Sequence, residues 1–76
     1  MTDSRHLGQL TAGEVAAVGR MDLPETAAGR VRERGVLTGA SVRMVRRAPL
    51  GCPIEFEVGG ARLALRQADA AQIFVQ

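Results

Sequence analysis

Two adjacent glycines, Gly59 and Gly60, separate two runs in which apolar and polar residues alternate, and they constrain the fold more than any other feature. A Gly-Gly pair between such runs is typical of a two-residue β-hairpin turn. The turn fixes the strand register, which can be counted outward from it. We therefore predict a hairpin over residues 54–65. Its cross-strand pairs would be Val58 with Ala61, Glu57 with Arg62, Phe56 with Leu63 and Ile54 with Leu65.

Three further strands are expected around this hairpin. Residues 15–21 form the first, with Gly19 marking a bend or bulge. From Ser41 onward, apolar residues again recur at every second position, which predicts a strand leading to the hairpin. Residues 73–76, with the sequence IFVQ, would close the sheet.

One short α-helix is predicted at about residues 24–34. Asp22 is a suitable N-cap, Pro24 suits the first helical position, and Gly35 offers a left-handed stop. A single helical turn is expected near residues 67–71.

The element order predicts a mainly β fold, namely a small SH3-like five-stranded barrel. Closing the sheet removes most strand edges, which a chain of 76 residues could not otherwise cover. We expect one domain over residues 1–76, with residues 1–6 frayed.

The inventory of catalytic groups is small. His6 is the only histidine, so a nucleophile–histidine site would have to recruit it from the polar N-terminal tail. Cys52 is the only cysteine, so the chain has two of the four Cys or His ligands that a structural zinc site needs. No phosphate-binding glycine motif occurs. We expect no catalytic residue, no cofactor, no protein-only metal site and no enzymatic activity. Weak surface coordination through Cys52 or a carboxylate stays open.

The arginines raise the alternative of a nucleic-acid-binding barrel. Against it, eight acidic residues offset ten arginines to a net charge of +2, and two phenylalanines are the only aromatic residues apart from His6. We therefore expect no nucleic-acid partner. The residues that favour the alternative lie on neighbouring predicted strands: Arg43, Arg46, Arg47, Arg62 and Arg66.

The turn between the second and third strands is the best candidate for partner binding. Leu50 lies at its tip, and Gly51 and Pro53 shape it. Arg46 and Arg47 would form a polar rim. Leu50 could instead fold back onto the end of the barrel, and the sequence does not choose between these two positions.

The sequence gives no sign of a membrane segment. No apolar run reaches the roughly 18 residues that a spanning helix needs, and the N-terminus lacks the apolar stretch of a signal peptide. A single cysteine fits a reducing compartment. We expect a cytoplasmic protein without direct membrane insertion. The leucine-tipped turn would also allow weak homo-oligomerisation.

Four motifs in order resemble the FeoA family and cover nearly the whole chain. LGQLTAGEVAAV (residues 7–18) is similar to the family's opening L-x-x-L-x-x-G-x-x-x-x-V. RGVLTG (residues 34–39) resembles its helix-ending M-G-L-x-x-G. Residues 45–59 resemble V-V-R-R-A-P-L-G-x-P-I-E-I-x-V-x-G, with Met44 in place of the first valine. ALRQADAAQIFV (residues 64–75) is similar to the family's ending.

This resemblance implies a small, non-enzymatic cytoplasmic accessory of bacterial ferrous iron transport. The implied partner is FeoB, a membrane transporter with a cytosolic G-protein-like domain. The same domain type forms the C-terminal part of some metal-dependent repressors, so a barrel associated with a metal-dependent regulator is an alternative function. Direct iron binding or sensing is a third possible function. Arg34 stands where family members often carry a hydrophobic residue, which implies weaker packing or a different contact surface there. Cys52 occupies a position where small residues are tolerated.

Overall fold

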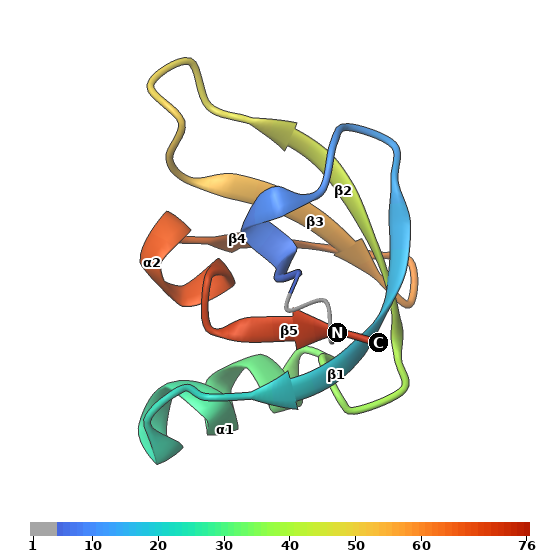
Figure 1. Ribbon diagram of the computed structural model, residues 1–76, viewed down its shortest axis with the longest axis vertical. Helices are drawn as coiled ribbons and strands as arrows, with labels where there is room; N and C mark the ends of the chain where they lie inside the picture. Colours follow the sequence, from blue (N-terminus) through green and yellow to red (C-terminus); the bar gives the residue numbers. More distant parts are fainter. Residues whose placement is uncertain (1–4) are drawn as a thin grey trace.

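Five antiparallel strands form one sheet in the computed structural model, in which residues 5–76 are described. The strand order is β4-β3-β2-β1-β5 (Figure 1). In chain order the elements are the 3₁₀ helix η1 (Leu7–Gln9), β1 (Val15–Met21), α1 (Glu25–Glu33), β2 (Ser41–Arg47), β3 (Ile54–Val58), β4 (Ala61–Leu65), α2 (Gln67–Ala70) and β5 (Ile73–Val75). The predicted mainly β fold, with one short helix and a later helical turn, is confirmed.

The β3–β4 hairpin has the register that was counted from its turn. All four predicted pairs are present, with Glu55 opposite Ala64 as the fifth. Gly59 and Gly60 both have positive φ angles, as the turn requires. The hairpin therefore follows directly from local sequence.

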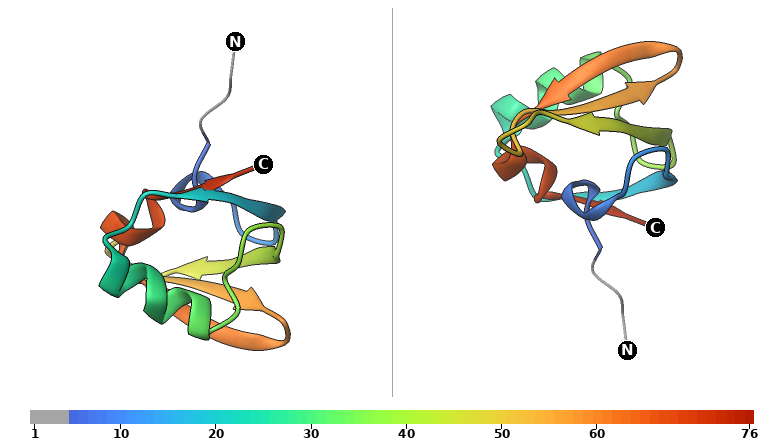
Figure 2. Two further views of the ribbon diagram at one scale, coloured as in Figure 1. Left: turned by 90° about the horizontal axis from the view of Figure 1, so that it is seen from below. Right: turned by 90° about the horizontal axis from the view of Figure 1, so that it is seen from above.

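The sheet folds over on itself and encloses the core. Figure 2 shows β2, β3 and β4 in one layer and β1 with β5 in the other. The β1–β5 register shifts between Val18 and Met21, where Gly19 was predicted to mark a bulge. Alternate residues of the strands point inward, among them Val18, Met44 and Phe56, which are almost completely buried. Burial of these aliphatic and aromatic side chains is the main source of stability in a domain this small.

The start of α1 differs from the prediction. The helix begins at Glu25, Pro24 is its cap residue, and no side chain caps it. Asp22 instead accepts a hydrogen bond from Arg20 Nε at 3.1 Å, and its N–H donates to the carbonyl of Gln72 at 2.7 Å. Asp22 is therefore engaged by the preceding strand and by the approach to β5.

The end of α1 is a Schellman motif. Gly35 has a φ of +98° and its N–H donates to the carbonyl of Arg32 at 2.9 Å, while the N–H of Val36 donates to that of Val31 at 3.0 Å. Val31 and Val36 both belong to the buried core. The predicted glycine stop is thus present, and it turns the chain into the core.

Residues 5 and 6 are held in place, although fraying was expected over residues 1–6. The N–H of Val75 donates to the carbonyl of Arg5 at 3.0 Å, and His6 forms an antiparallel bridge with Phe74. Leu7, in the unpredicted η1, is completely buried and so fixes the adjoining chain. Residues 1–4 lie outside the described part of the chain.

Candidate functional site

The β2–β3 turn, residues 48–53, projects from one end of the molecule (Figure 1). The N–H of Ala48 donates to the carbonyl of Pro53 at 3.0 Å, and the N–H of Gly51 donates back to the carbonyl of Ala48 at 2.7 Å. Gly51 has a φ of +90°, which a side chain would disfavour. Two internal hydrogen bonds and two prolines therefore give the turn a defined shape.

Leu50 extends from this turn into solvent. Its exposed fraction is 97%, compared with 56% for Val15 and 51% for Leu37, which are the next most exposed large hydrophobic residues within residues 5–76. Of the two positions that the sequence allowed, the structure has the exposed one. Pro53, the last residue of the turn, is also exposed. An apolar side chain so completely free of its own core is available for contact with another molecule.

The two arginines before the turn lie in different environments. Arg46 is exposed and its Nη2 lies 3.5 Å from Glu55 Oε2, at the base of the turn. Arg47 is partly buried and donates to the backbone carbonyls of Gly8 and Leu10, the latter at 3.3 Å. Arg46 therefore lies where a rim residue was expected, whereas Arg47 joins the end of β2 to η1.

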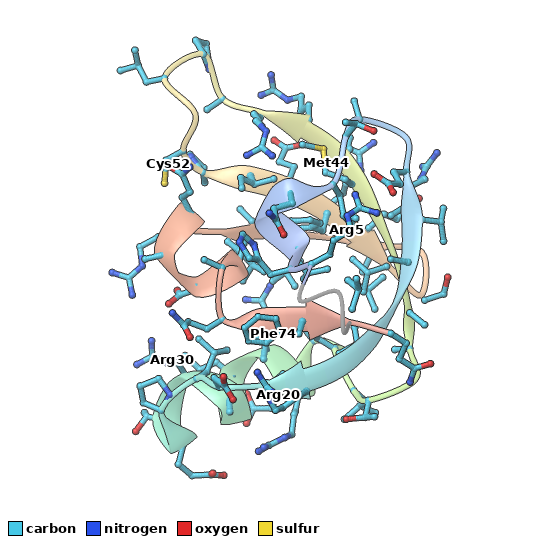
Figure 3. The ribbon with its side chains drawn as sticks, viewed as in Figure 1. Arg5, Arg20, Arg30, Met44, Cys52 and Phe74 are labelled. Atoms are coloured by element: carbon cyan, nitrogen blue, oxygen red, sulfur yellow. The ribbon has the colours of Figure 1, made fainter. Side chains whose placement is uncertain are left out.

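Cys52 connects the turn to α2. Its exposed Sγ accepts a hydrogen bond from the N–H of Gln67 at 3.4 Å (Figure 3). Within residues 5–76, no three or more His, Cys, Asp or Glu side chains gather in a way that could hold a metal ion.

Two glutamates offset much of the positive charge on the arginine-rich strand face. Arg43 forms an ion pair with Glu57, while Arg46 and Arg62 both approach Glu55, at 3.5 and 3.4 Å. A phosphate backbone would have to compete with these carboxylates for the guanidinium groups. This arrangement disfavours the nucleic-acid alternative on this face.

One feature was not predicted from the sequence: a groove of about 360 Å³ between α1 and β4. Two arginines lie along it, Arg30 of α1 and Arg34 at the C-terminal cap of that helix. Their spacing of four residues places them on one side of the helix, which is a signal that the sequence does contain.

No helix in residues 5–76 is long and apolar enough to cross a membrane.

Comparison with known proteins gives a consistent result. Residues 5–76 match the family model of the FeoA domain. No curated protein matches the chain. The FeoA protein of Chlorobium tepidum shares 33% identity and a TM-score of 0.91 with it, over 95% of this chain and 69% of that one.

FeoA of Stenotrophomonas maltophilia, solved with zinc, shares 35% identity and a TM-score of 0.82, over 96% of this chain and 91% of that one. It is described as a prokaryotic SH3 domain protein and a candidate activating factor of ferrous iron transport. A manganese-dependent transcriptional repressor shares the fold, with a TM-score of 0.86 at 20% identity over 37% of its length. The SH3-like fold expected from the sequence is thus confirmed, and this chain belongs to the FeoA family.

Proposed function

We propose that this protein is a cytoplasmic accessory factor of bacterial ferrous iron transport that acts by binding and carries out no catalysis. Membership of the FeoA family supports the pathway. The description of the Stenotrophomonas maltophilia relative as a candidate activating factor of ferrous iron transport supports the accessory role. The partner we propose is the cytosolic part of a FeoB-type transporter.

The observation that carries this proposal is the exposure of Leu50 at the tip of a well-defined turn. Leu50 would enter an apolar pocket of the transporter, with Gly51 and Pro53 setting the shape of the turn and Arg46 at the rim. A stiff turn loses little conformational entropy when it binds, so more of the contact energy contributes to affinity. Arg47 takes part indirectly, because its bonds to the carbonyls of Gly8 and Leu10 fix the end of β2.

The test is a pull-down of the detergent-solubilised FeoB-type transporter of the same organism with wild-type protein and with Leu50→Asp. Leu50→Asp should retain much less transporter than the wild type does, because an aspartate that entered an apolar pocket would bury an unpaired charge. It should fold normally, since Leu50 contacts little of its own protein.

Leu37→Asp is the matched control. Leu37 is also exposed, at 51%, but lies between α1 and β2 and not in the turn. This variant should retain the transporter as the wild type does. Equal retention by Leu50→Asp and the wild type would remove the turn from the contact. No retention by folded wild-type protein would contradict the proposed partner.

A further inference from the structure

The groove between α1 and β4 has an apolar floor and a basic rim. Buried side chains from both elements form the floor, namely Val31, Leu63 and Leu65. Three exposed arginines stand around it: Arg30 on α1, Arg34 at the C-terminal cap of α1, and Arg66 before α2. Figure 3 shows Arg30 on α1, on the side of the molecule where α2 lies. The groove therefore combines a surface for an apolar group with a positively charged border.

Two arginines of this groove, Arg30 on α1 and Arg34 at its C-terminal cap, have no acidic partner within residues 5–76. Seven of the chain's ten arginines form ion pairs with carboxylates there: Arg5, Arg20, Arg32, Arg43, Arg46, Arg62 and Arg66. Arg47 is occupied by backbone carbonyls. That leaves Arg30 and Arg34. The acidic residue between them, Glu33, forms no ion pair with either and does not line the groove; it lines a second hollow, which Arg34 also borders.

The groove runs along a free strand edge. β4 is the last strand in the sheet order, so among the described residues 5–76 its edge opposite β3 has no partner strand. Leu63 and Leu65 belong to one face of β4 and Ala64 to the other, yet all three line the groove. A groove that reaches both faces of a strand lies at its edge. An extended segment added at this edge would pair with the outward backbone N–H and C=O groups of β4.

We propose that this groove binds a short, extended acidic segment of a partner protein. The segment would lie along β4, with two carboxylates facing Arg30 and Arg34 and an apolar side chain on the floor. Four helical residues advance about 6 Å along the axis. Alternate residues of an extended chain are separated by about 7 Å, so an acidic-x-acidic pattern matches the two arginines.

The lining favours a peptide over a nucleic acid. No aromatic side chain lines the groove for base stacking, and the carboxylate of Asp69 stands in its wall beside Arg66, at 3.3 Å. The site is distinct from the Leu50 turn, and the proposal does not depend on the proposed contact with the transporter.

The test uses a fluorescein-labelled synthetic peptide with a Glu-Leu-Glu-Leu core, titrated with the full-length protein and followed by anisotropy. We expect saturable binding that weakens as salt is added. Arg30→Glu and Arg34→Glu should each weaken it about tenfold or more, because like charges would then face each other. Thermal unfolding of each variant verifies that it is folded.

Arg32→Glu is the matched control. It lies on the same helix but pairs with Glu25 at 3.1 Å and does not line the groove. Its affinity for the peptide should stay close to the wild-type value. An equal loss in this variant would show a general charge effect and would overturn the proposal.

Amide chemical shifts separate this site from the turn. With the labelled peptide replaced by its unlabelled form, shifts should gather at Leu23, Val31, Leu63 and Leu65, and Leu50→Asp should bind it normally. Shifts confined to Leu50, or equal binding of a Lys-Leu-Lys-Leu peptide, would overturn the proposal. Displacement of the labelled peptide by single-stranded DNA as effective as that by the unlabelled peptide would also overturn it. Self-association that Arg34→Glu abolishes would assign the groove to a second copy instead.

Discussion

Arg5 holds the carboxylate of Glu14 with both of its terminal nitrogens, at 2.9 and 3.1 Å. The N–H of Thr11 donates to the same carboxylate at 3.0 Å. The Arg5 hydrogen bonds, followed by the one from Thr11, lower the pKa of Glu14 from 4.5 to about 2. This contact fastens the segment before η1 to the residue that precedes β1.

This pair predicts an acid-dependent loss of stability. A carboxyl whose pKa is lower in the folded than in the unfolded state stabilises the fold above its unfolded pKa. That contribution is lost as the pH falls through the folded pKa. For Glu14 the loss should therefore occur between about pH 4.5 and pH 2. Glu14→Gln should be less stable than the wild type at pH 6. The difference in the free energy of unfolding between the two proteins should become smaller as the pH falls from about 4.5 to 2. Urea unfolding at a series of pH values measures it.

Arg5→Gln provides the second half of that test. Without the guanidinium, the pKa of Glu14 should return toward 4.5 in an NMR titration. A gap between Glu14→Gln and wild type that stays constant from pH 6 to pH 2 would argue against the ion pair as the source of the stabilisation.

Arg47 should be important for stability in a way that its neighbour Arg46 is not. Arg47→Met would remove the donor to the carbonyls of Gly8 and Leu10 in a partly buried site. The expected cost is about 1–3 kcal/mol. Arg46→Met removes only an exposed ion pair and should change the free energy of unfolding by less than about 0.5 kcal/mol. Equal costs in denaturant unfolding would refute this distinction.

The difference between these two arginines also shows how far the sequence could lead. The hairpin register depends on residues within the hairpin, so alternation and the Gly59-Gly60 turn were enough to predict it. The partner of Arg47, by contrast, is 39 positions away in the chain. Only the packing of η1 against the sheet brings the two together. Alternation along a strand shows which face a residue lies on but not what lies opposite it in the fold.

The groove beside α1 was missed for a related reason. Arg30 and Arg34 could be placed on one helix face by their spacing, and Arg34 was noted as a departure from the family pattern. That α1 would lie beside the edge of β4 depends on how the helix packs, and no local pattern encodes it. For the turn, the sequence identified Leu50 but left two positions open, because exposure of a loop residue is a tertiary property.

Ferrous iron should not stabilise the folded protein. Cys52 is exposed, and within the described residues no cluster of His, Cys, Asp and Glu side chains surrounds it. A ligand that binds only the folded state raises the melting temperature, so an unchanged melting temperature shows that no such binding occurs. Anaerobic Fe(II) should leave the melting temperatures of wild type and Cys52→Ser unchanged. A saturable rise in the wild type that Cys52→Ser removes would reveal a metal site at this thiol.

Two glycines near α1 should respond to the same substitution with opposite signs. Gly29 lies in the helix and an added Cβ would meet nothing within 4 Å, so Gly29→Ala should stabilise by about 0.5–1 kcal/mol. Gly35 has a φ of +98° and its Cβ would approach Val58 Cγ1 at 3.4 Å. Gly35→Ala should therefore destabilise by about 1–2 kcal/mol, the cost of a left-handed residue with a side chain. Urea unfolding of both variants measures these two changes in the free energy of unfolding. Stabilisation by Gly35→Ala would contradict the Schellman ending of α1, which directs Val36 into the core.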